Sequence, residues 1–169
     1  MNKRFLIVFL VFSFMLNAQQ RGKKEIPVLH EISNKDVVQS VYPDAVKVEK
    51  ANDFWFRIIN EKNQVVGFAM ASTPFCKDII GYNKTTPVMI ITDKSWKIQK
   101  VSILTNWETL GFVRKLEKNG YFDLWVGKTL KEAKSVKPDG YTGATCTALA
   151  VSKNVTFLLE NGDKVLPKK

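Results

Sequence analysis

The sequence predicts an α+β fold, a single domain in which an antiparallel sheet of hairpins packs with several short helices. Aromatic and β-branched runs occur in pairs joined by polar turns, which is typical of β-hairpins. Elsewhere, apolar residues recur at helical spacing between capping residues and helix-stop signals. A chain of 169 residues with 45% apolar residues can bury the core of one such domain. Hairpins mixed with helices favour an antiparallel sheet.

Two hairpins are expected to form the sheet. Their strands are the runs 53–60 with 65–71, and 87–91 with 96–104. The alternation of apolar residues along the last of these runs changes phase near Lys100, which predicts a β-bulge there.

Caps and stop signals mark the expected helices. Helical segments are expected after Ser33, Thr109 and Thr129, and from about Ala144. The residue before a proline resists the helical conformation, and Asn-Gly pairs favour helix ends. The expected helix ends are therefore before Pro43, at Asn119–Gly120, before Pro138 and at Asn161–Gly162.

The N-terminus has the pattern of a secretory signal peptide over residues 1–18. Lys3 and Arg4 precede an apolar stretch over 5–16, and Ala18 precedes a polar region. A membrane-spanning helix needs roughly 20 apolar residues, so an uncleaved signal anchor is the less favoured alternative. No cysteine follows to carry a lipid. We expect cleavage after Ala18 and export to the periplasm or cell envelope, leaving an N-terminal extension (19–32) and a folded domain (33–169).

The chain is basic, but its charge is dispersed. It has 26 Lys and Arg against 16 Asp and Glu, a formal net charge of +10, which cleavage after Ala18 would lower to +8. Nucleic-acid binding requires a concentrated basic stripe, which is absent from the sequence, so no nucleic-acid partner is expected. The excess charge is either an ordinary solvated surface or an attraction to an acidic redox partner or, in peripheral contact, to an anionic membrane.

Cysteine and histidine are too scarce for metal or thiol chemistry. Cys76 and Cys146 are the only cysteines, and in an exported protein they could form one disulfide or remain free thiols. There is no Cys-x-x-Cys pair, and His30 is the only histidine. Neither a metal cage nor a Cys/His nucleophile is therefore supported.

Small residues and hydroxyls concentrate over residues 139–147, at the start of the last expected helix. The first-turn N–H groups of a helix lack intrahelical acceptors, so such a start suits a phosphate group. Gly143 and Ala144 would let a ligand approach the backbone. The plainer interpretation is a helix cap with close packing. The Gly-x-x-x-x-Gly-Lys pattern of nucleotide-binding loops is absent.

This segment resembles the signature of the FMN-binding domain of bacterial electron-transfer proteins, which include flavin subunits of the sodium-translocating quinone reductase and of the Rnf complex. The signature positions are occupied here by Asp139, Thr142, Gly143, Ala144 and Thr145. Two upstream blocks also agree with the family in order and spacing: Gly81-Tyr82, and Glu108-Thr109-Leu110-Gly111 with leucine in place of a proline.

The resemblance implies a covalent cofactor. In the family, the residue corresponding to Thr145 is joined to FMN through a phosphodiester by a flavin transferase that uses FAD, and Asp139 would be recognised by that enzyme. Backbone N–H groups would hold the phosphate without a dedicated Lys or Arg. The residues implied to contact the cofactor are Tyr82, Glu108, Thr109, Leu110, Gly111, Thr142, Gly143, Ala144 and Thr147. Trp107 and Trp125 are candidates for stacking on the ring, and a Cys76–Cys146 disulfide would brace this site.

Together these expectations describe an exported electron carrier. Covalent FMN on Thr145 would pass electrons from a membrane-associated redox donor to an acceptor of unknown identity. No paired carboxylates or Ser/His/Asp set is visible, which favours a carrier over an enzyme with its own substrate. Two alternatives stay open: reversible FMN binding, and a non-redox envelope-binding or regulatory module that uses its basic surface.

Overall fold

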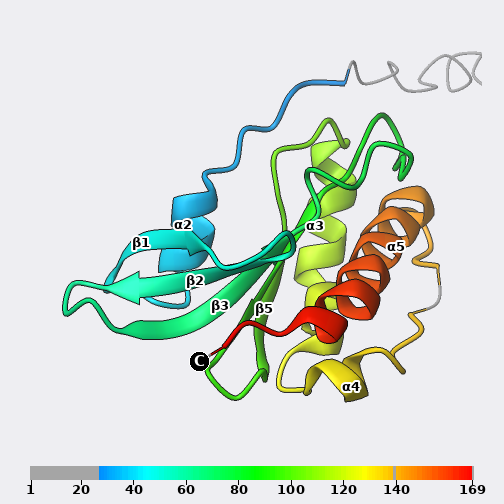
Figure 1. Ribbon diagram of the computed structural model, residues 1–169. Helices are drawn as coiled ribbons and strands as arrows, with labels where there is room; N and C mark the ends of the chain where they lie inside the picture. The colour runs from blue at the N-terminus through cyan, green and yellow to red at the C-terminus, as the bar shows by residue number, and fades with distance from the viewer. Residues whose placement is uncertain (1–26, 139, 169) are drawn as a thin grey trace, which may run out of the picture.

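A five-stranded antiparallel sheet forms the centre of the computed structural model, which describes residues 27–138 and 140–168. Each strand is hydrogen-bonded to the next along the chain, in the order β1-β2-β3-β4-β5. The strands are β1 (Ala45–Lys50), β2 (Trp55–Asn60), β3 (Val65–Ala71), β4 (Val88–Thr92) and β5 (Ile98–Ile103). Helices lie on both sides of the sheet (Figure 1). The predicted α+β fold is confirmed.

Both predicted hairpins are confirmed as β2–β3 and β4–β5, and the β4–β5 register shifts next to Lys100, as the predicted bulge requires. Strand β1 was not predicted. Its Val46 and Val48 alternate with charged residues, but both valines are exposed, at 59% and 46%, because β1 is an edge strand. Pairing with β2, rather than burial of its side chains, makes this segment a strand.

The helices also follow the predicted signals. They are α2 (Asn34–Gln39), α3 (Leu110–Lys118), α4 (Leu130–Ala133) and α5 (Thr145–Gly162), with 3₁₀ segments η1 (Tyr121–Trp125) and η2 (Asp163–Val165). Ser33 Oγ accepts a hydrogen bond from Asp36 N at 3.2 Å, and Thr129 forms a capping box with Glu132. Gly120, which follows α3, has a left-handed φ of 66°. The aromatic η1 segment was not predicted.

Successive side chains of each strand point to opposite faces of the sheet, and helices cover both faces. On β3, Phe68 and Met70 face the core that α3 and α5 complete, whereas Ala69 faces the smaller core beneath α2. Every residue of β4 is buried for the same reason. Figure 1 shows α3 and α5 side by side on one face of the sheet and α2 on the other. The position of α5 is therefore set by the larger core.

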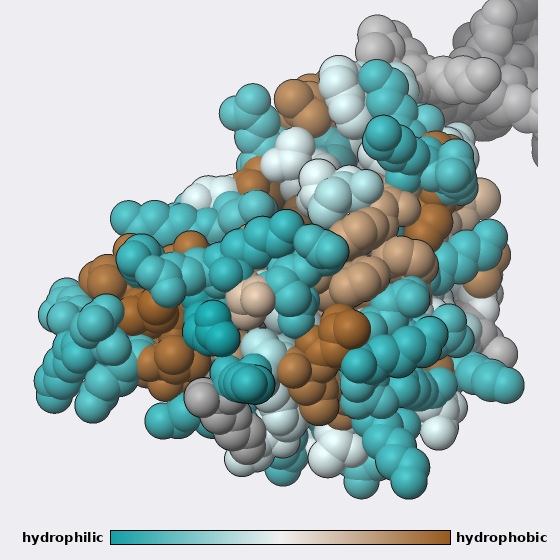
Figure 2. All heavy atoms as spheres, in the orientation of Figure 1, coloured by the Kyte–Doolittle hydropathy of each residue, from teal (hydrophilic) through white to brown (hydrophobic). Residues whose placement is uncertain are grey.

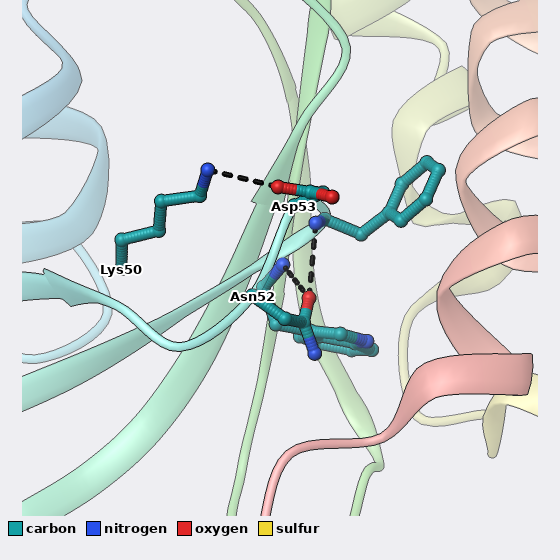
Figure 3. Close-up of polar contacts among 5 residues, drawn as sticks. Lys50, Asn52 and Asp53 are labelled. Atoms are coloured by element: carbon teal, nitrogen blue, oxygen red, sulfur yellow. Dashed lines mark hydrogen bonds and ion pairs between the residues drawn. The ribbon is translucent and has the colours of Figure 1, made fainter.

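The turn between β1 and β2 holds the C-terminal end of α5. Asn52 Oδ1 accepts hydrogen bonds from the backbone N–H groups of Phe54 and Trp55, both at 2.9 Å (Figure 3). Asn52 Nδ2 donates to Val165 O at 2.7 Å, and the buried Trp55 Nε1 donates to Gly162 O at 2.9 Å. These contacts fix one end of α5, and the rigidity of the helix carries that constraint to its first turn.

Hydrophilic residues cover most of the face shown in Figure 2, with small hydrophobic patches over the β1–β3 end and over α5. Within the described ranges, none of the helices has the length and apolar character needed to span a membrane. The predicted signal peptide, residues 1–18, and most of the 19–32 extension lie outside the described residues. The domain boundaries and the export signal therefore stay predictions.

Candidate functional site

Thr145 is the first residue of α5, and its side chain is exposed. Its Oγ1 donates to the carbonyl oxygen of Tyr141 at 3.0 Å. The same carbonyl accepts a hydrogen bond from Ala144 N at 2.9 Å, which closes a tight turn before the helix. Gly143 lies in this turn with a φ of +81°, a left-handed conformation that favours glycine. The turn therefore presents the Thr145 hydroxyl at a defined position on the surface.

The N-terminus of α5 has no side-chain cap. Ala144 occupies the N-cap position, and no side chain among the described residues accepts a hydrogen bond there. Helix starts usually carry Ser, Thr, Asp or Asn at this position. The interpretation of the segment as an ordinary cap is therefore wrong, although Ala144 is closely packed in the core as the same interpretation required. The first-turn N–H groups have no side-chain acceptor and remain available to an anion.

Glu108 connects the three blocks that resemble the family. Its side chain is completely buried, with 0% exposed. Oε1 accepts hydrogen bonds from Tyr82 N at 2.9 Å and from Thr86 Oγ1 at 2.7 Å, and Oε2 accepts one from Thr147 Oγ1 at 2.5 Å. Buried polar atoms are stable only when they are hydrogen-bonded, and here both carboxyl oxygens are. Glu108 thus fixes the Tyr82 loop and the first turn of α5 relative to each other.

Gly81 makes room for this carboxyl group. A Cβ on Gly81 would lie 1.9 Å from Glu108 Oε1 and 2.3 Å from Thr86 Oγ1. We expect Gly81→Ala to lower the free energy of unfolding by about 2 kcal/mol, because the buried hydrogen bonds must shift. Urea denaturation measures this loss.

The matched control for this prediction is Gly111→Ala. A Cβ on Gly111 meets nothing within 4 Å, and the residue lies in α3, where alanine is favoured over glycine. Equal unfolding free energies for the two variants would contradict the steric role given to Gly81.

Exposed side chains lie above this buried cluster. Tyr82 is 52% exposed and Leu110 is 41% exposed. The ring of Tyr82 meets the edge of Phe112, with 4.9 Å between centroids. Lys84 Nζ lies 3.8 Å from the centroid of the partly exposed Trp107 ring. The structure therefore brings the Tyr82 loop and the start of α3 together, and their outer surface carries the exposed side chains of Tyr82 and Leu110 beside the charged Lys84.

The N-terminal segment contributes to the same site, which the sequence analysis did not predict. His30 pairs with Asn106 through two backbone hydrogen bonds, of 2.8 and 3.1 Å, and His30 Nε2 donates to Glu108 O at 2.7 Å. Ile32 N donates to Thr105 Oγ1 at 3.0 Å. His30 and Ile32 therefore hold the loop that carries Glu108, although they lie in the predicted extension rather than in the predicted domain. No local sequence pattern marks such a contact.

Tyr121 braces α5 one turn after Thr145. Its hydroxyl donates to Ala148 O at 2.8 Å inside the core. Burial raises the pKa of Tyr121 to about 12, compared with about 10 for an unfolded chain. Because the folded-state pKa is the higher one, the contribution to stability is complete below a pH of about 10 and is lost as the pH rises to about 12.

We therefore expect the free energy of unfolding to fall more steeply between about pH 9 and pH 11 in the wild type than in Tyr121→Phe, which has no titrating hydroxyl. Urea denaturation at the two pH values measures both slopes. Comparison of the two proteins cancels the titration of the other tyrosines and of the lysines. Identical slopes would contradict the assignment.

The remaining candidate residues differ in where the structure places them. Trp125 is only 1% exposed and packs in the core, which leaves no face for a flavin ring. Cys76 is buried and Cys146 is exposed, and both are free thiols, so the disulfide considered from the sequence is not formed. Asp139 lies outside the described residues. Thr142 is exposed and Thr147 is buried against Glu108.

A comparison with protein families gives one match that includes these residues. The FMN-binding domain family matches residues 81–160, a span that begins at the Gly81-Tyr82 block and includes Glu108 and most of α5. No curated protein matches the chain. FMN is the cofactor that this match supports. Residues 81–160 thus match the FMN-binding domain family, in agreement with the resemblance seen in the sequence.

Proposed function

We propose that the chain carries FMN attached to Thr145 through a phosphodiester and serves as an exported electron carrier. The observation that supports this most directly is the exposed Thr145 hydroxyl, which lies at an uncapped helix start inside the family match. A core or capping threonine would have its hydroxyl buried or bonded to the first-turn N–H groups. Thr145 instead donates to Tyr141 O and leaves those groups open.

Attachment is a group transfer performed by a flavin transferase. Thr145 Oγ1 forms a bond to the FMN phosphorus of FAD as the pyrophosphate P–O bond breaks, AMP leaves and the hydroxyl proton is released. The hydrogen bond from Thr145 to Tyr141 O orients the hydroxyl before that step. Asp139, by its place in the family signature, is proposed to be recognised by the transferase.

The start of α5 fits a phosphate group. Thr142 and Gly143 are exposed and the helix has no side-chain cap, so backbone N–H groups can donate to phosphate oxygens. The helix dipole adds roughly 0.3–1 kcal/mol for an anion at this position. Thr147 takes part indirectly, because its hydroxyl is bonded to Glu108.

Two exposed side chains nearby fit a flavin ring. Tyr82 and Leu110 offer exposed apolar area, Thr109 is the N-cap of α3, and Gly111 lies in the first turn of that helix. When bound, FMN supplies the electron transfer, and the protein orients the ring and sets its surroundings. Glu108 lies beneath these side chains and holds the Tyr82 loop and the first turn of α5 in place through its hydrogen bonds to Tyr82 N and Thr147 Oγ1. We propose a membrane-associated redox donor and a separate acceptor as partners.

Intact-mass analysis tests the proposal. The chain is co-produced in the periplasm with a flavin transferase, and its mass should exceed that of the mature chain by one FMN less one water. A yellow fluorescent band should survive denaturing electrophoresis. Colour that is lost on denaturation would support reversible FMN binding instead. A colourless protein with salt-sensitive polyanion binding would support a non-redox module that uses the basic surface.

A further inference from the structure

We propose that Lys115 binds the phosphate group of the cofactor, an inference that rests on the attachment proposed above. Lys115 is an exposed residue of α3, and its ammonium group lies against the turn that precedes Thr145. A Cβ on Gly143 would lie only 2.5 Å from Lys115 Nζ. The ammonium group therefore occupies the space that any other residue at position 143 would fill.

The backbone conformation of the turn favours glycine at position 143. Its φ of +81° favours glycine whatever surrounds it. In addition, the missing side chain lets Lys115 approach the backbone of the turn. The turn therefore has a cation beside the attachment residue, where an anionic ligand would be held.

The hydrogen-bonding capacity of Lys115 Nζ is unused by the residues that the structure describes. Lys50 and Lys134 each form an ion pair with an aspartate, but no carboxylate of residues 27–138 or 140–168 pairs with Lys115. The nearest aromatic group is the ring of Tyr141, whose centroid lies 5.8 Å from Nζ. An ammonium group has three N–H donors, so those of Lys115 are available to a ligand.

The same turn holds the attachment hydroxyl. Tyr141 places its ring near Lys115 and its carbonyl oxygen against Thr145 Oγ1. A phosphodiester on Thr145 keeps one negative charge, and a charge-assisted hydrogen bond is about twice as strong as a neutral one. Lys115 would supply such a bond in addition to the α5 N–H groups. From the sequence, the backbone N–H groups were expected to hold the phosphate without a dedicated Lys or Arg. Only the fold brings Lys115, from a different helix, to this turn.

The test uses the full chain co-produced with a flavin transferase, as the wild type, Lys115→Gln, Lys115→Arg and Lys118→Gln. Lys118 is the matched control, since it is an exposed lysine one turn further along α3. The attachment time course is followed by intact mass, and the attached phosphodiester is observed by phosphorus NMR. We expect Lys115→Gln to slow attachment by about tenfold, the effect of losing one hydrogen bond to a charged group.

We also expect Lys115→Gln to shift the phosphorus resonance, Lys115→Arg to restore most of the attachment rate, and Lys118→Gln to change neither quantity. An unchanged rate in Lys115→Gln would overturn the inference. A slower rate with an unmoved resonance would also overturn it, because Lys115 would then act in docking the transferase. A wild-type chain that acquires no FMN would instead overturn the proposed function, on which the inference depends.

Discussion

Thr145→Ala is expected to abolish covalent attachment of FMN, whereas Thr145→Ser retains it. Alanine has no oxygen with which to form the phosphodiester, and serine keeps a hydroxyl on the same carbon. The hydroxyl of Thr145 is exposed and makes one hydrogen bond, to Tyr141 O. Its removal should therefore cost no more than about 1 kcal/mol of stability, and the chain should stay folded. Intact mass after co-production with a flavin transferase measures the attachment.

Thr156→Ala is the control for this result. Thr156 is an exposed threonine on the same helix, far from the first turn, and its variant should carry the same mass increase as the wild type. A full mass increase in Thr145→Ala would show that another residue is modified. Peptide mapping would then locate it, with the exposed Thr142 as the nearest alternative hydroxyl.

Glu108→Ala is expected to lower the free energy of unfolding by about 4 kcal/mol, a large share of the stability of an ordinary domain. The substitution leaves two buried donors, Thr86 Oγ1 and Thr147 Oγ1, and the part-buried Tyr82 N without their acceptor, and it opens a cavity. Chemical denaturation followed by circular dichroism measures the loss.

Glu108→Gln is the control for this loss, because glutamine has nearly the same size as glutamate and can keep most of the hydrogen bonds. The amide oxygen can still accept from Tyr82 N and Thr86 Oγ1, and the Thr147 hydroxyl can rotate to accept from the new amide nitrogen. We expect a loss of about 1 kcal/mol. If glutamine destabilised the chain as much as alanine, the acceptor role given to Glu108 would be contradicted.

Local signals predicted most of the architecture. The two hairpins, the bulge near Lys100, the Ser33 and Thr129 caps and the start of α5 near Ala144 all depend on residues within a few positions of one another. Such short-range effects can be read from a single sequence. Edge strand β1 was missed although Val46 and Val48 alternate with charged residues, because the run is short and its pairing with β2 is a contact that the sequence does not show.

The candidate site was predictable only in part. The signature around Thr145 and the two upstream blocks are visible in the sequence, and their resemblance to a family gave the cofactor class. The bonds that unite them are long-range. Glu108 meets a donor 39 residues away in Thr147, and His30 meets Glu108 O across 78 residues. Sequence spacing carries no information about such pairs.

The sequence by itself determined most of the secondary-structure elements, the chemically distinctive turn at Thr145 and the scarcity of metal-binding side chains. The tertiary structure decided that Glu108 is buried and connects the Tyr82 loop to α5, that α5 begins without a side-chain cap, and that Lys115 reaches Gly143. The physical reason is packing. Burial of apolar residues on both faces of the sheet sets the position of α5 against β4 and α3, and only that position determines which polar groups meet.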